Sequence, residues 1–149
     1  MRIDKIYDKI GFVERYRILS SQYSSENYME KYSPNTVLHI FNELGYAPEY
    51  FNKEKFFRVS NKINSHDVWF HIGVNRGLVE LMLYIKDGNE FLKPCGPFSW
   101  IPDEIGQRQD VRIKPPSFSN YEELKNILKE GLIMFEDLKR EFLDLLKSE

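Results

Sequence analysis

The segment from Val68 to Ile85 constrains the fold most, because two alternating runs of residues flank a turn-forming tripeptide. One side of the alternation is apolar throughout: Val68, Phe70, Ile72 and Val74 in the first run, and Val79, Leu81, Leu83 and Ile85 in the second. A period of two residues is typical of strands that cover a core with one face. Asn75 and Gly77, which tolerate positive φ, supply the turn chemistry. The segment therefore predicts an antiparallel hairpin.

The second side of this hairpin is also rich in large side chains. It carries Trp69, His71, Glu80, Met82 and Tyr84. This set is too apolar for a face that only water covers. We therefore expect either a helix or a partner molecule to cover part of it.

Length and composition favour one domain spanning residues 1–149, with 42% hydrophobic and 30% charged residues. The 21 basic and 23 acidic side chains give a net charge of −2, which provides no global field for attracting nucleic acid. No apolar run is long enough to span a membrane, and the N-terminus lacks a signal-peptide core. The single Cys95 cannot form an internal disulfide, which agrees with a reducing compartment. We expect a cytoplasmic protein.

Two helices are predicted in the first third of the chain. Apolar residues recur at helical spacing from Ile3 to about Leu19, although Gly11 weakens the middle of the pattern. Further on, Ser33 is a suitable N-cap and Pro34 fits the first helical position. Gly45 ends this second helix.

The C-terminal segment predicts the longest helix. Ser119 and Glu122 form a capping-box pattern at its start. The main apolar stripe consists of Leu124, Leu128, Gly131, Phe135, Leu138, Phe142 and Leu145. Ile127, Leu132 and Leu146 widen this stripe, so the helix should pack across the sheet.

A further strand is predicted over Phe56–Ile63, followed by a turn over Asn64–Asp67, so that residues 56–85 form a three-strand meander. Residues 86–116 contain too many Gly and Pro residues for a long element. Within them, Phe91–Leu92 and Val111–Ile113 are candidates for a short strand pair. The elements together predict an α+β fold, an antiparallel β-meander packed against N-terminal, central and long C-terminal helices.

The residue types that most often carry catalysis are few. His66 and His71 should point to opposite faces of one strand, so they cannot easily share a metal ion. Asp67 lies in a predicted turn, and no sequence signal places a base beside Cys95. We also find no serine elbow, phosphate-binding glycine loop or zinc-ligand spacing. We therefore expect no metal and no cofactor.

The loop of residues 96–104 combines aromatic and acidic side chains, and it has two interpretations. Phe98 and Trp100 stand near Asp103 and Glu104, a combination that suits recognition of a basic partner. Alternatively, the two aromatic side chains tuck under the loop and close the open end of the core.

Short sequence patterns follow one another along the chain: Glu14-Arg15-Tyr16, Leu44-Gly45-Tyr46, Gly77-Leu78-Val79-Glu80, Gly96-Pro97-Phe98 and Pro116–Leu124. In this layout the chain resembles small bacterial immunity proteins that accompany polymorphic or contact-dependent toxins. The resemblance implies a cytoplasmic, non-enzymatic protein that binds a cognate toxin C-terminal domain, and many such domains are nucleases. The resemblance transfers no individual residue. The net charge of −2 departs from the strongly acidic balance of many nuclease inhibitors.

The leading hypothesis is therefore a protein-binding inhibitor of a toxin. Its expected partner-binding residues are Trp69, Tyr84, Phe98, Trp100, Asp103 and Glu104. In this hypothesis the carboxylates steer association with a basic toxin and the aromatic side chains form the buried centre. One alternative is a small nuclease or hydrolase in which His66, His71, Cys95 or acidic residues converge in space. Another is a module that binds a small ligand or forms a homo-oligomer through the face of Trp69, Met82 and Tyr84.

Overall fold

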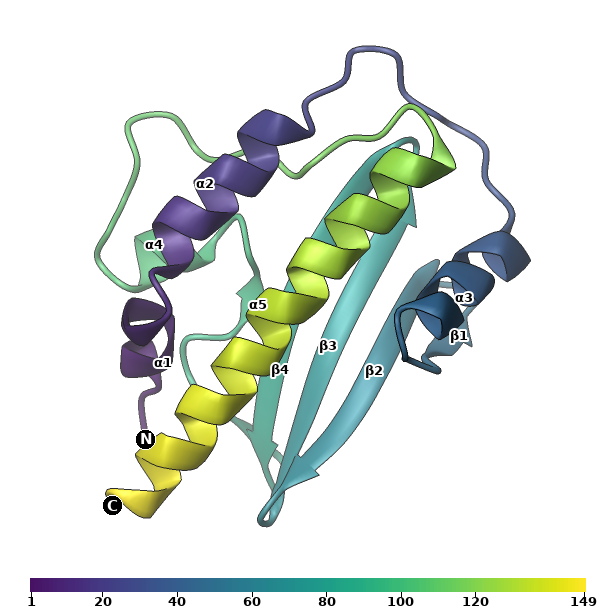
Figure 1. The fold of residues 1–149 in the computed structure, drawn as a ribbon. Helices are drawn as coiled ribbons and strands as arrows, with labels where there is room; N and C mark the ends of the chain where they lie inside the picture. The colour runs from purple at the N-terminus through teal and green to yellow at the C-terminus, as the bar shows by residue number, and fades with distance from the viewer.

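The fold is built on an antiparallel sheet of six strands (Figure 1). The computed structural model describes residues 1–149. The strands are β1 (Glu49–Phe51), β2 (Phe56–Ile63), β3 (His66–Asn75), β4 (Leu78–Asp87), β5 (Glu90–Phe91) and β6 (Gly96–Pro97). They follow the order β1-β2-β3-β4-β5, and β6 also pairs with β4. The predicted meander of β2, β3 and β4 is confirmed. It is extended by β1 at one edge and by β5 and β6 at the other, and none of these three pairings was predicted.

The hairpin between β3 and β4 closes through a two-residue turn at Arg76 and Gly77. Their φ angles are +51° and +81°. Positive φ at both central residues suits the right-handed twist of the flanking strands. The prediction assigned this role to Asn75, but Asn75 is the last residue of β3 and pairs with Leu78.

Two other predicted connections are wrong in detail. The turn between β2 and β3 occupies only residues 64–65, so β3 begins at His66. Residues 111–113 form no strand, and β5 instead folds back on the end of β4, with Glu90 opposite Asp87. This local pairing closes a much shorter loop than a pairing with residues 111–113 would, so it costs less chain entropy.

Five helices accompany the sheet. They are α1 (Asp4–Lys9), α2 (Phe12–Gln22), α3 (Pro34–Glu43), α4 (Ile101–Glu104) and α5 (Tyr121–Lys147). The single helix predicted from Ile3 to Leu19 is wrong, because Gly11 adopts a φ of +64° and separates α1 from α2. The prediction for α3 is confirmed, since the Ser33 hydroxyl accepts a hydrogen bond from the Thr36 backbone N–H at 3.4 Å.

The cap of α5 lies one residue further along the chain than predicted. The side-chain oxygen of Asn120 accepts a hydrogen bond from the Glu123 backbone N–H at 2.8 Å. The Glu123 carboxylate accepts two more, each of 2.7 Å, from the backbone N–H and the hydroxyl of Ser119. Asn120 and Glu123 therefore replace Ser119 and Glu122 as the capping pair. None of the helices, α5 included, is both long and apolar enough for a membrane span.

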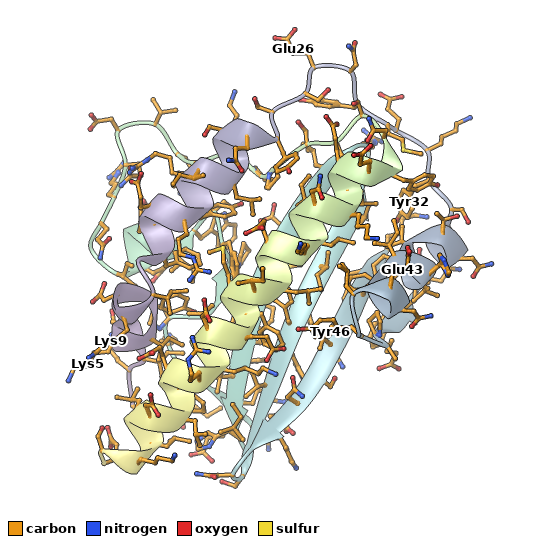
Figure 2. All side chains as sticks on the ribbon, in the orientation of Figure 1. Lys5, Lys9, Glu26, Tyr32, Glu43 and Tyr46 are labelled. Carbon is orange, nitrogen blue, oxygen red and sulfur yellow. The ribbon has the colours of Figure 1, made fainter.

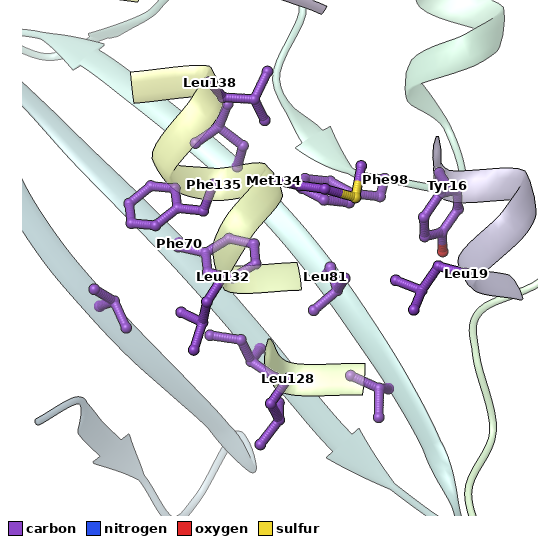
Figure 3. Packing of buried hydrophobic residues seen from close by; sticks show 14 of the residues in the cluster. Tyr16, Leu19, Phe70, Leu81, Phe98, Leu128, Leu132, Met134, Phe135 and Leu138 are labelled. Carbon is purple, nitrogen blue, oxygen red and sulfur yellow. The ribbon is translucent and has the colours of Figure 1, made fainter. Parts of the chain in front are cut away.

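The core lies between the sheet and α5, which crosses one face with α2 and α3 on either side (Figure 1). A single cluster of 33 buried residues fills this space. Phe135 on α5 stacks on Phe70 of β3 with ring centres 4.7 Å apart (Figure 3). Beside it α5 approaches the sheet closely at Gly131, where a Cβ atom would lie 3.0 Å from Leu81 Cδ1.

Polar side chains fasten the flanking helices to α5. Arg15 Nη1 on α2 lies 2.8 Å from Asp137 Oδ2. Tyr46, which follows α3, lies beside α5 in Figure 2, and its hydroxyl donates to Glu136 at 2.7 Å. All this packing lies on one side of the sheet.

Candidate binding surface

The other face of the sheet has no covering layer. Along β2, β3 and β4 the side chains facing away from the core are all half-buried or exposed. The strand registers bring seven of them together with one neighbour on β1 and one on β5. We call this surface of nine residues the open face: Phe51, Phe56, Arg58, Trp69, His71, Met82, Tyr84, Lys86 and Phe91. We expected either a helix or a partner molecule to cover part of this face. No helix covers it, so a partner molecule is the alternative that we propose.

Arg58 projects from β2 into the open face, between aromatic rings on β1 and β3. Its guanidinium carbon lies 4.0 Å from the centre of the Trp69 ring and 4.7 Å from that of Phe51. Its Nε donates a hydrogen bond of 2.9 Å to Nε2 of His71. Cation–π contacts of this kind are each worth about 0.5–2 kcal/mol. Two rings and one hydrogen bond therefore hold the guanidinium in a defined orientation.

His71 acts as the acceptor for Arg58. Burial and the neighbouring charge of Arg58 lower the pKa of His71 from 6.5 to about 4, so the ring is neutral at pH 7. With Nε2 accepting, the ring proton resides on Nδ1. The ring also stacks on Phe56, with centres 4.5 Å apart. His71 therefore orients Arg58 without neutralising its charge.

A second basic side chain, Lys86 on β4, also contacts the Trp69 ring. Lys86 Nζ is 5.0 Å from the centre of the Trp69 ring and 5.3 Å from that of Phe91. Tyr84 packs edge-on against Phe91 at 5.7 Å, and burial raises the pKa of Tyr84. The open face thus presents rings and two cations at neutral pH.

The six residues expected to bind a partner fall into three locations. Trp69 and Tyr84 lie in adjacent register on β3 and β4, within the open face. Trp100, Asp103 and Glu104 lie at α4, beside α1 and beyond the β4 edge of the sheet (Figure 1). Trp100 is 54% exposed, and Asp103 pairs with a neighbouring arginine at 3.0 Å. The structure does not bring these two sets together.

Phe98, the sixth residue, is completely buried. Its ring packs edge-on against Phe12 at 4.8 Å and Tyr16 at 5.7 Å. Figure 3 places it between Met134 of α5 and Tyr16 of α2. For Phe98 the packing alternative is therefore correct, and the prediction of a surface contact is wrong, because this side chain closes the core at the β4 edge.

The residues considered for catalysis are dispersed. His66 packs edge-on against Phe142 of α5 at 5.2 Å, on the core side, whereas His71 lies on the open face. Cys95 is half-buried, and burial raises the pKa of its thiol, which disfavours the thiolate needed for nucleophilic attack. Histidine, cysteine and carboxylate side chains do not gather in groups of three that would suit a metal ion.

The largest surface hollow, about 740 Å³, lies between the end of α2 and residues 109–117. Most of its lining is polar, with several serines and charged side chains. It differs from the deep apolar pocket that a small-ligand module would use.

Sequence reasoning missed the central part played by Arg58 and the contributions of Phe51, Phe56 and Lys86. A signal was present in the alternation over residues 56–63. Because Phe57 faces the core, Phe56 and Arg58 must face the other way. Arg58 pairs with His71 in the strand register, yet its side chain contacts Trp69, which pairs with Ser60. The alternation alone does not specify this diagonal contact.

Comparisons with protein-family models, curated proteins and solved structures found no match to this chain.

Proposed function

We propose that this protein is a bacterial immunity protein that binds a cognate toxin domain through the open face and neutralises it without catalysis. The observation that supports this proposal is an uncovered sheet face whose aromatic and cationic side chains hold one another in place. The resemblance in sequence layout to immunity proteins supplies the class of partner. The proposal places the protein in the cytoplasm, where such inhibitors act.

The composition of the open face suits tight protein binding. Tryptophan, tyrosine and arginine are the residues that most often dominate binding energy in protein interfaces. Here Trp69, Tyr84 and Arg58 contact their neighbours within the free protein, so little side-chain entropy is lost on binding.

The acidic set at α4 is a second, smaller candidate surface. Trp100, Asp103 and Glu104 line one small hollow together with Arg112. Because Arg112 already pairs with Asp103, much of the local negative charge is compensated. We therefore assign the main contact to the open face. The carboxylates at α4 play only a lesser part, in steering a basic toxin.

The test is co-expression with the toxin domain encoded immediately upstream, followed by co-purification and a growth assay. We expect the wild-type protein to co-purify and to restore growth. The double substitution Trp69→Ala and Tyr84→Ala should weaken binding by ~100-fold or more, as expected for central aromatic anchors. Tyr28→Ala is the matched control, because Tyr28 is an exposed aromatic side chain outside the open face.

Three results would count against the proposal. Wild-type protein that neither binds nor restores growth would refute the immunity function. Loss of binding in Trp100→Ala, with Trp69→Ala unaffected, would move the contact to α4. A symmetric dimer in light scattering that Trp69→Ala converts to monomer would favour the oligomerising alternative. Circular dichroism of each variant confirms that the fold is retained.

A further inference from the structure

Arg58 and Lys86 have no carboxylate partner within the protein. Both contact the same indole ring, with the Arg58 guanidinium carbon 4.0 Å and Lys86 Nζ 5.0 Å from the centre of Trp69. Neither side chain takes part in an ion pair. Asp67 lies directly opposite Lys86 in the strand register, but it pairs with Lys62 at 3.6 Å. Glu49 lies directly opposite Arg58 in the strand register, but it forms no ion pair with it. Arg58 and Lys86 therefore both lack an ion-pair partner within the protein.

The two terminal nitrogens of the Arg58 guanidinium are free to bind a partner. Nε is used in the hydrogen bond to His71, while the terminal Nη groups donate to no protein atom. The planar fork of a guanidinium matches a carboxylate, which it binds through two parallel hydrogen bonds. Since Trp69, Phe51 and His71 hold the group in place, a carboxylate would meet a site that is already ordered.

Glu80, which also faces away from the core on β4, is hydrogen-bonded to a different neighbour. It accepts a hydrogen bond of 3.2 Å from the Ser99 hydroxyl, at the β4 edge. Burial raises the pKa of Glu80. Glu80 forms no ion pair with Arg58 or Lys86.

We propose that the open face binds an acidic segment of the toxin domain, in which one aspartate or glutamate carboxylate binds at Arg58, beside the Trp69 ring that Lys86 also contacts. Arg58 binds this carboxylate through its Nη groups, and Lys86 contributes a second positive charge. Apolar residues beside the carboxylate pack on Phe51 and Phe91, at the two ends of the cluster. This inference rests on the proposed function and specifies the partner's chemistry.

Charge and ring geometry favour a protein carboxylate over a nucleic acid. A polyphosphate is bound through many basic side chains, whereas the open face presents only Arg58 and Lys86. In addition, the guanidinium already lies over the Trp69 ring, which reduces the ring surface available for stacking a base.

A first experiment tests the site without the toxin. The chain has two tryptophans, so nuclear magnetic resonance shows two indole N–H signals, and Trp69→Phe identifies that of Trp69. We expect a blocked peptide of alternating leucine and glutamate to shift the Trp69 signal saturably, and the same peptide with glutamine to shift it at least ~10-fold more weakly. Equal responses to both peptides, or a response to single-stranded oligouridine alone, would overturn the inference.

A second experiment uses the complex with the toxin domain. Arg58→Met should weaken binding by ~100-fold and Lys86→Met by ~10-fold, in the range measured for paired interface charges. Arg58→Lys, which keeps the charge but loses the fork, should recover only part of the affinity. Lys129→Met is the matched control, because Lys129 is an exposed lysine on α5, on the opposite side of the sheet, and it should stay within ~3-fold of wild type.

The two proposals fail in different ways. Wild-type protein that does not bind the toxin domain refutes the immunity function, and the peptide titration still decides the carboxylate site. Wild-type binding that Arg58→Met and Lys86→Met leave unchanged refutes the carboxylate site and retains the immunity function.

Discussion

Replacement of Gly77 by alanine should destabilise the protein strongly, for two separable reasons. Gly77 adopts a φ of +81°, and an L-residue in this left-handed region costs about 1–2 kcal/mol. An added Cβ would also lie 2.6 Å from Cβ and 3.1 Å from Cα of Tyr28. Overpacking of this kind costs a further ~1–3 kcal/mol. Gly77→Ala should therefore lower the free energy of unfolding by about 2–5 kcal/mol.

The Tyr28 contact cannot be relieved by rotating a side chain, because the atoms concerned belong to the backbone and its first carbon. The Met29 backbone N–H donates to the Phe118 carbonyl at 3.0 Å, which holds this segment against the hairpin turn. Movement of residues 28–29 would therefore break packing between two distant parts of the chain.

Gly88→Ala is the matched control. Gly88 also lies in a turn with positive φ, +63°, but an added Cβ would meet nothing within 4 Å. It should lose only the backbone contribution, about 1–2 kcal/mol. Urea unfolding followed by far-ultraviolet circular dichroism gives both values, and their difference measures the Tyr28 contact. Losses that agree within about 0.5 kcal/mol would refute the reasoning.

Three further predictions concern single side chains. Folding lowers the pKa of His71 from 6.5 to about 4. Between pH 6.5 and 4 the unfolded state therefore binds more protons than the folded state. The stability contributed by neutral His71 is lost as the pH falls through this range. His71→Gln keeps an acceptor for the guanidinium but does not titrate, so urea unfolding at pH 7 and pH 4 should show a smaller pH-dependent loss, by about 1 kcal/mol after allowance for partial exposure. Phe98→Ala should cost about 3–5 kcal/mol and Trp100→Ala less than about 0.5 kcal/mol in the same assay, and equal losses would contradict the packing role of Phe98. Asp137→Asn should cost about 1 kcal/mol by weakening its ion pairs with Arg15 and Arg140, and a loss unchanged in 1 M salt would argue against an electrostatic origin.

Much of the strand architecture follows from local sequence pattern. In β3 and β4 the side-chain period fixes which residues share a face, so the sequence alone places Phe70 and Leu83 on one face and Trp69 and Tyr84 on the other. The start of α3 at Ser33 and its end before Gly45 are likewise set by local sequence. These features depend on neighbours a few residues apart, which a sequence contains directly.

The sequence could not decide whether a helix also covers the second face of the hairpin, because that face too carries large side chains. That choice depends on α5, which begins more than thirty residues after β4 and packs its own stripe through Gly131 against Leu81. The same long-range packing buries Phe98 and leaves Trp100 exposed, although only one residue separates them.

The candidate binding surface divides in the same way. Its membership follows from alternation along β2, β3 and β4, whereas its chemistry depends on contacts between strands. Arg58 reaches both Trp69 and His71 only because β2 lies beside β3 in one register, and a shift of one residue would send Arg58 to the core side. The sequence therefore determined the side chains that each strand presents, and the tertiary structure decided that they remain uncovered and that two of their cations remain unpaired.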